Sequence, residues 1–114
     1  MLGRWFNKER NYLLCRRAAS GLVQALEKYD EPNLPLNIGF GTDLLIKDLA
    51  NKIAKISGFN GNIIWDKTKP TGQKRKILSN IRMSKYNIFL KDTPLDIALD
   101  ETLKWYKKWK MNKI

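Results

Sequence analysis

Four cations lie close together around a turn in the second half of the sequence. The stretch "KPTGQKRK" places Lys69 before a Pro-x-Gly turn and Lys74, Arg75 and Lys76 directly after it. Arginine supplies a planar fork of donors and lysine a point charge, and both bind phosphate oxygens. Gly72 lets a ligand come close to the backbone. The stretch is therefore a candidate diphosphate-binding loop, and the alternative is a solvated surface loop.

The net charge of +11 is unevenly distributed along the chain. Residues 1–17 hold five cations and one acid, eight cations fall between Lys67 and Lys91, and five more follow from Lys104 onward. Residues 18–57 are nearly balanced. A basic surface attracts polyanions in general, so its sign alone does not distinguish nucleic acid from a diphosphate ligand or from a solvated basic face.

Composition excludes several classes of protein and site. A chain of 114 residues with 43% hydrophobic content is typical of one globular domain with one core. Its only cysteine is Cys15 and it has no histidine, which excludes an intrachain disulfide, a Cys/His zinc site and a histidine-based triad. Charges interrupt every apolar run, and the sequence has no signal-peptide pattern, so we expect a cytoplasmic protein without a membrane span.

Hydrophobic periodicity predicts three helices, in residues 16–30, 43–58 and 92–110. We expect the last helix to begin with Thr93 as its N-cap and Pro94 at its first helical position. The apolar stripes expected to be buried comprise, in chain order, Ala18, Ala19, Leu22, Val23, Leu26 and Tyr29; Ile46, Leu49, Ala50, Ile53, Ala54 and Ile56; and Leu95, Ala98, Leu99, Thr102, Trp105, Tyr106 and Trp109.

Short strands are expected between the helices. "LPLNIG" (34–39) and "NIIW" (62–65) are typical of strands, and Gly58 lies where a helix C-terminus favours glycine. Residues 76–90 are compatible with either a strand or a turn of helix. The order predicts an α/β (α+β-like) chain with about three helices and two or three short strands.

Four motifs, in this order, resemble the C-terminal part of GDP-L-fucose synthase and related NAD(P)-dependent nucleotide-sugar epimerases and dehydratases of the extended short-chain dehydrogenase family. They are "NIGFG" (37–41), "IKDLANKIAKISGFNG" (46–61), "IIWDKTKPTGQKRK" (63–76) and "TPLDIALDETLKWY" (93–106). The resemblance covers residues 18–109 and implies a substrate-binding domain, over residues 18–110, that closes over a GDP-sugar. Residues 111–114 would form a tail.

The resemblance also implies roles for particular residues. Arg75 and Lys76 would meet the substrate diphosphate, with Gly72 allowing the close approach of the backbone. Just before the first helix the family has the pattern "R-E-F-[LI]-x-V-[ED]-D", in which the arginine helps to hold the substrate phosphate. Arg10, Tyr12 and Leu13 match that pattern. The implied substrate-binding set is Arg75, Lys76, Gly72 and Arg10.

The motifs of the family's cofactor-binding half do not occur in this sequence. The family has a G-x-x-G-x-x-G turn, which seats the cofactor pyrophosphate, and a Tyr-x-x-x-Lys pair with a serine for hydride transfer. NADP is therefore implied for the family enzyme and not for this chain alone, which has no catalytic residues or metal ligands of its own. We expect no catalysis without a companion cofactor-binding half, and a homo-oligomer is left open.

Residues 1–17 diverge from the family and are basic. Arg16 and Arg17 stand where the family has acids, and codons for Cys-Arg-Arg read one nucleotide later can encode Val-Glu-Glu. We hypothesise that residues 1–17 are a frameshifted remnant.

The alternative function is a small basic module that binds nucleic acid or another partner. Four tryptophans beside cations favour it, because aromatic rings stack on bases: Trp5, Trp65, Trp105 and Trp109. The helical stripe, however, assigns Trp105 and Trp109 to the core, and the sequence has no recognition-helix or zinc-finger signature. Nucleic acid is therefore the less favoured partner.

Overall fold

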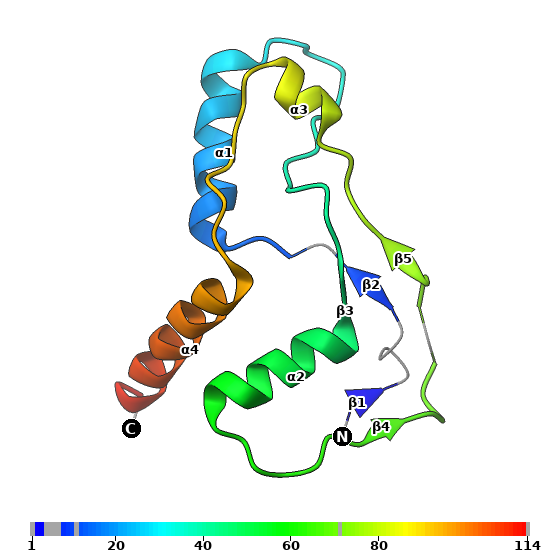
Figure 1. Cartoon of the computed structure of the whole chain (residues 1–114). Coiled ribbons are helices and arrows are strands. Elements are labelled where there is room, and N and C mark those ends of the chain that lie inside the picture. Colours follow the sequence, from blue (N-terminus) through cyan, green and yellow to red (C-terminus); the bar gives the residue numbers. More distant parts are fainter. Residues whose placement is uncertain (1, 4–7, 11, 71, 114) are drawn as a thin grey trace.

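The computed structural model describes residues 2–3, 8–10, 12–70 and 72–113. Four helices occur in this part of the chain: α1 (Cys15–Lys28), α2 (Ile46–Ser57), α3 (Ile81–Lys85) and α4 (Leu95–Met111) (Figure 1). The described strands have two residues each: β1 (Leu2–Gly3), β2 (Glu9–Arg10), β3 (Leu44–Leu45), β4 (Trp65–Asp66) and β5 (Arg75–Lys76). The α/β class is confirmed, and the described residues contain one short helix and at least two short strands more than expected.

The strands form two small sheets that bring distant parts of the chain together. β2 lies between β3, to which it is antiparallel, and β5, to which it is parallel. β1 pairs with β4 in parallel. β1 and β2, which both fall within residues 1–17, thus pair with strands from the middle of the chain.

α2 follows its sequence pattern closely. Gly58 adopts a left-handed conformation (φ 72°) at the C-cap, and its N–H donates to the carbonyls of Ala54 and Lys55, as expected for a helix C-terminus. The apolar stripe of α2 faces α4, and the Lys52 ammonium donates to the Asp96 carboxylate at 2.8 Å between the two helices. No residue of α2 is buried, however, and Ile53 of its apolar stripe is 44% exposed, so the burial expected for this stripe is only partial.

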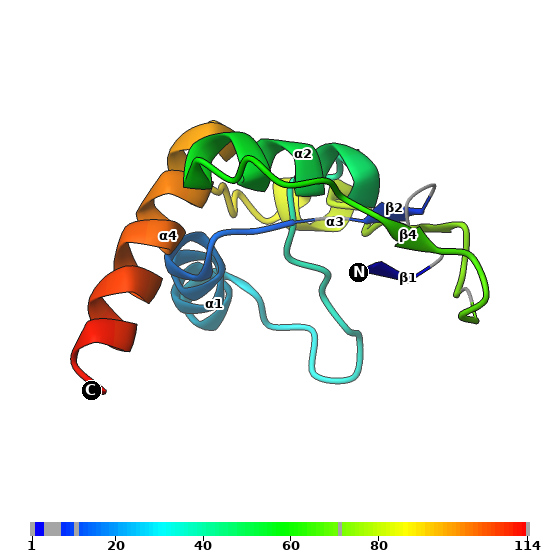
Figure 2. The same cartoon turned by 90° about the horizontal axis from the view of Figure 1, so that it is seen from below.

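α4 departs from its expected start and from its expected burial. Pro94, not Thr93, is the N-cap, and the Thr93 hydroxyl instead accepts a hydrogen bond from Arg17 Nε at 2.8 Å. Trp105, Tyr106 and Trp109, expected in the core, are exposed. These three residues continue the apolar stripe of the N-terminal half of α4, which packs on the chain. The C-terminal half, which carries them, extends beyond the rest of the chain, as Figure 2 shows.

α1 also contradicts its expected burial, because its leucine face points to solvent. Leu22, Val23 and Leu26 are 63%, 58% and 86% exposed. The opposite face, which carries Gly21, Gln24 and Lys28, lies along the segment between α3 and α4, which runs beside α1 in Figure 1. Hydrogen bonds to backbone groups of that segment hold the helix in place.

Residues 34–39, all of them described, form no strand, so that prediction is wrong. The carbonyls of Leu34 and Pro35 accept hydrogen bonds from the side chains of Tyr29 and Arg82, at 2.7 and 2.6 Å, in place of a neighbouring strand. Of residues 62–65, only Trp65 lies in a strand, β4. Residues 76–90 contain both of the elements considered, the end of β5 and then α3.

The buried core is small for a chain of this length. Among the described residues, the buried hydrophobic side chains are Met83, Ile88 and Ala98. The radius of gyration is 16.9 Å, against about 13 Å for a compact domain of this size. The accessible surface is 8767 Å², against about 6,500 Å² expected. None of the described helices is both long and apolar enough to cross a membrane.

Candidate functional site

The basic edge, which we define as Arg10, Gly72, Arg75 and Lys76, is assembled from two strands and the loop before β5. β2 and β5 pair with Arg10 opposite Lys76, although these residues are more than sixty positions apart in the sequence. Arg10 Nη2 also donates to the Gln73 carbonyl at 3.0 Å, next to Gly72. The structure therefore brings together the four residues that the sequence predicted.

Asp43 belongs to the same edge, and sequence reasoning missed it. Arg75 Nε donates to Asp43 Oδ2 at 2.5 Å, and the Asp43 side chain is only 18% exposed. A largely buried carboxylate of this kind orients a guanidinium and so determines which of its donors face outward. The available signal was an acid two residues after Gly41, at the end of the "NIGFG" motif.

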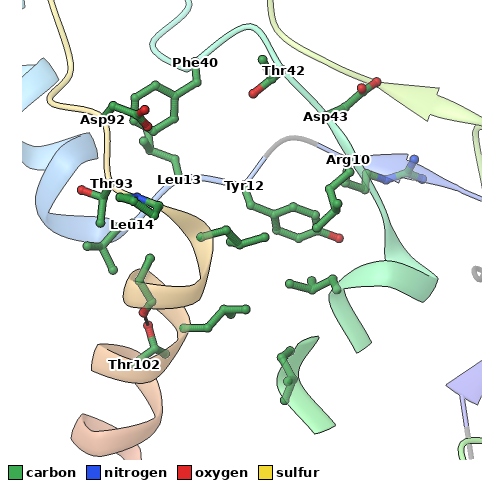
Figure 3. A pocket seen from close by; sticks show the side chains of 17 residues that line it. Arg10, Tyr12, Leu13, Leu14, Phe40, Thr42, Asp43, Asp92, Thr93 and Thr102 are labelled. Carbon is green, nitrogen blue, oxygen red and sulfur yellow. Dashed lines mark hydrogen bonds between the residues drawn. The ribbon is translucent and has the colours of Figure 1, made fainter. Parts of the chain in front are cut away.

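A cavity of about 630 Å³ lies beside the basic edge, between α2 and α4. Arg10 and Asp43 lie at its polar side, and Figure 3 shows the Tyr12 ring extending into the space between the two helices. The apolar side chains that line it are Leu13, Leu14, Phe40, Leu44, Leu49, Ile53, Pro94, Leu95, Ala98 and Leu99. Its charged lining residues are Arg10, Asp43 and Asp92. An apolar hollow with a cation at one side suits a ligand with a flat or apolar part and a charged part.

Tyr12 connects the hollow to the basic edge. Its burial raises the pKa of the phenol, and the nearby Arg10 cation opposes this by favouring the ionised form. The phenol is therefore a neutral hydroxyl at physiological pH. It can donate or accept a hydrogen bond, but it is not suited to remove a proton from a ligand.

The loop between β4 and β5 is ordered at its start by Asp66. Thr68 donates to Asp66 Oδ1 twice, from its hydroxyl at 2.6 Å and from its backbone N–H at 3.0 Å. These bonds lower the pKa of the Asp66 carboxyl, the hydroxyl bond most. Beyond this turn, Lys69 and Lys74 are exposed, as are Arg75 and Lys76, so exposure does not distinguish the two pairs.

Of the four tryptophans that favoured nucleic acid, Trp65 is half-buried in β4, and Trp5 lies outside the described residues. Trp105 and Trp109 are exposed and stacked, with ring centroids 6.2 Å apart, and the Lys113 ammonium lies 4.2 Å from the centre of the Trp109 ring. The assignment of these two rings to the core is wrong, so this argument against base stacking no longer holds.

No established protein-family profile matches the sequence. The chain is 35% identical over 71 residues to the probable GDP-L-fucose synthase 1 of rice, Oryza sativa subsp. japonica. This match covers 62% of the chain and 21% of the rice protein. The GDP-L-fucose synthase of Escherichia coli is 34% identical over 71 residues, which cover 62% of the chain and 22% of that protein.

Comparison with solved structures leads to the same family. The GDP-L-fucose synthetase of Naegleria fowleri, solved with NADP bound, superposes on 93% of the chain with a TM-score of 0.84 and 25% identity. The match covers 33% of the Naegleria chain. The chain thus spans about a fifth to a third of the length of the proteins it matches. In sequence and in fold, this chain is similar to the C-terminal part of GDP-L-fucose synthases.

Proposed function

We propose that this chain is the nucleotide-sugar-binding domain of a GDP-L-fucose synthase-like epimerase/reductase, and that the basic edge binds the substrate diphosphate. The observation that carries the proposal is the pairing of β2 with β5, which places Arg10 opposite Lys76, while Arg75, the preceding residue of β5, is paired with Glu9. Cations from two strands offer more directional donors to a diphosphate than a single loop does. The adjacent apolar hollow has the size of a small-molecule site.

Catalysis would need a cofactor-binding half, which we propose is supplied by another part of the protein or by a second polypeptide. NADP would be bound there, as in the Naegleria relative. The chain itself would position the nucleotide sugar. Without that half, we expect no NADPH oxidation in the presence of a GDP-4-keto-6-deoxy sugar, and turnover above a buffer control would contradict this expectation.

Calorimetric titration with GDP-L-fucose tests the binding role. Arg75→Ala should weaken binding by roughly 1.5 to 3 kcal/mol, because a charge-assisted hydrogen bond is lost. Lys74→Ala is the matched control: it removes an exposed neighbouring cation and should cost less than about 0.5 kcal/mol. The titration is run on the chain with and without a co-expressed cofactor-binding half. Equal small losses for both variants, or no binding by the parent under either condition, would contradict the proposal.

Single-stranded nucleic acid is the second candidate ligand, favoured by the exposed Trp105 and Trp109 rings on the lysine-rich end of α4. Stacking of a base on such a ring contributes about 1 to 3 kcal/mol. In that case Trp109→Ala would weaken binding of an oligonucleotide. Affinity would also fall log-linearly with salt, and Arg75→Ala and Lys74→Ala would have similar effects. Binding of GDP-L-fucose should depend less on salt and on Trp109, and it should be weakened more by Arg75→Ala than by Lys74→Ala.

A further inference from the structure

An aromatic stripe, which we define as Trp105, Tyr106 and Trp109, lies on the C-terminal half of α4. The three side chains are 63%, 46% and 42% exposed. They are one and four residues apart, so all three fall within about 100° of the circumference of the helix. In Figures 1 and 2 this half of α4 ends at the margin of the molecule. The aromatic stripe is therefore accessible to a partner with a broad surface.

The aromatic stripe is bordered by lysines. From residue 104 to the end, the sequence has no acid and five lysines: Lys104, Lys107, Lys108, Lys110 and Lys113. An α-helix turns by about 100° per residue, so Lys108 and Lys110 lie on either side of the stripe. Lys104 lies on the opposite side of α4 and forms an ion pair with Asp100 at 2.6 Å. A partner for this surface must therefore carry negative charge beside an apolar layer.

The packing of the rings favours lipid over nucleic acid as that partner. The Trp105 and Trp109 rings are nearly parallel, at 18°, with centroids 6.2 Å apart. Stacked bases are spaced by about 3.4 Å, so a base between these rings would need roughly 6.8 Å. The Lys113 ammonium lies over the Trp109 ring, 4.2 Å from its centre. The rings thus form one continuous surface, and tryptophan and tyrosine beside lysine are typical of helices that lie in a membrane interface.

We propose that residues 104–113 bind the surface of a bilayer that contains acidic phospholipids. The aromatic stripe lies among the lipid headgroups, where amphipathic rings are favoured. The flanking lysines reach acidic headgroups while their alkyl stems stay beside the rings. The net charge of +11 adds a long-range attraction to the same surface. This inference goes beyond the proposed function and does not depend on it, because none of these residues belongs to the basic edge.

Sedimentation with lipid vesicles tests the proposal. The full chain is mixed with vesicles of phosphatidylcholine alone, or of phosphatidylcholine with about one quarter phosphatidylserine. We expect the apparent affinity to be at least about tenfold higher for the acidic vesicles and to fall as salt is raised. The tryptophan emission of the parent chain should also shift to shorter wavelength with the acidic vesicles, because Trp105 and Trp109 leave water.

A pair of double variants separates the aromatic stripe from exposed rings in general. Trp105→Ala/Trp109→Ala should lower the affinity for acidic vesicles at least about tenfold. The matched control is Phe59→Ala/Phe89→Ala, which removes two rings that are 54% and 60% exposed and lie outside α4. The control should leave the affinity unchanged, and equal losses for the two double variants would overturn the proposal.

A second pair of double variants separates the flanking lysines from the overall charge. Lys108→Glu/Lys110→Glu should lower the affinity for acidic vesicles at least about tenfold. The matched control, Lys67→Glu/Lys69→Glu, changes the net charge by the same amount at two exposed lysines between β4 and β5, and it should lower the affinity at most about twofold. Equal losses would show that the whole chain's charge attracts the vesicles, and would overturn the proposal.

The parent chain alone also decides the proposal, whether or not every variant folds. Equal sedimentation with the two kinds of vesicle would overturn it, as would an emission spectrum that acidic vesicles leave unchanged. A third result would assign the aromatic stripe to nucleic acid and overturn the proposal as well. It is binding of a single-stranded oligothymidylate, without sedimentation of the parent chain on acidic vesicles.

Discussion

α1 and α2 are amphipathic helices of similar length, 14 and 12 residues, yet they turn opposite faces toward the rest of the chain. α2 directs its apolar stripe at α4. α1 presents its apolar stripe to solvent and uses Gly21 and Gln24 for its internal contacts. Hydrophobic periodicity therefore locates a helix and its two faces, but it does not reveal which partner covers the apolar one.

The substitution expected to lower the free energy of unfolding most lies in neither helix. It lies in the segment between α3 and α4, on which α1 packs. Ile88 is the most buried side chain among the described residues, at 0% exposure. Ile88→Ala should lower the free energy of unfolding by about 2 to 5 kcal/mol, because it removes buried methyl groups and leaves a cavity. Urea unfolding followed by circular dichroism measures this. Leu22→Ala is the control and should cost less than about 0.5 kcal/mol, since it changes an exposed surface.

A substitution with a smaller expected effect on the free energy of unfolding tests the close contact of α1 with the chain at Gly21. Gly21→Val should lower the free energy of unfolding by about 1 to 3 kcal/mol, because the new side chain meets Ile38 and Leu90 methyl groups. Ala19→Val is the matched control on the exposed face and should cost only the difference in helix propensity, less than about 1 kcal/mol. Similar costs for the two variants would show that α1 does not pack through Gly21.

Prediction from sequence succeeded where local chemistry decides the structure. The Gly58 C-cap and the position of α2 both follow from short-range preferences. The family resemblance placed Arg10 in one substrate-binding set with residues of the "KPTGQKRK" loop. The strand pairing that joins them was not predicted, because strands of two residues have no periodicity to detect. Asp43 was missed because its role depends on an ion pair across 32 positions.

The failures share one physical cause. Leu26 and Trp109 were assigned to a core because apolar helical stripes are usually buried, but this chain has few buried side chains to receive them. The strand expected at residues 34–39 is replaced by carbonyls that bond to side chains. In both cases the expected packing partner, an apolar surface or a neighbouring strand, is not found among the described residues. The domain boundaries at residues 17 and 110, and the frameshift hypothesis, stay predictions.

The smallest expected effect on stability is a pH dependence, and it comes from a hydrogen bond to the loop that follows α1. The Tyr86 hydroxyl donates to the Glu31 carboxylate at 2.8 Å, and this bond, more than burial or nearby charges, raises the pKa of Tyr86 to about 12. Because the pKa in the folded state lies above the ordinary value of 10, this contribution to stability is complete below pH 10 and is lost as the pH rises from 10 toward 12. Tyr86→Phe should remove that part of the decline, measured as the unfolding midpoint against pH. An unchanged decline would refute the role of this bond.

The most direct test of the packing of α1 compares two substitutions that lie only two positions, or about 3 Å of helical rise, apart: Gln24→Ala and Leu26→Ala. In an ordinary amphipathic helix, the leucine is buried and the glutamine is exposed. Replacing the leucine then lowers the free energy of unfolding, whereas replacing the glutamine does not. Here Gln24→Ala should lower the free energy of unfolding of the free chain by roughly 1 to 3 kcal/mol, because the Phe89 backbone groups lose their partners. Leu26→Ala should change it by less than about 0.5 kcal/mol. A loss of 2 to 5 kcal/mol for Leu26→Ala, typical of a core leucine, with no loss for Gln24→Ala, would contradict the account.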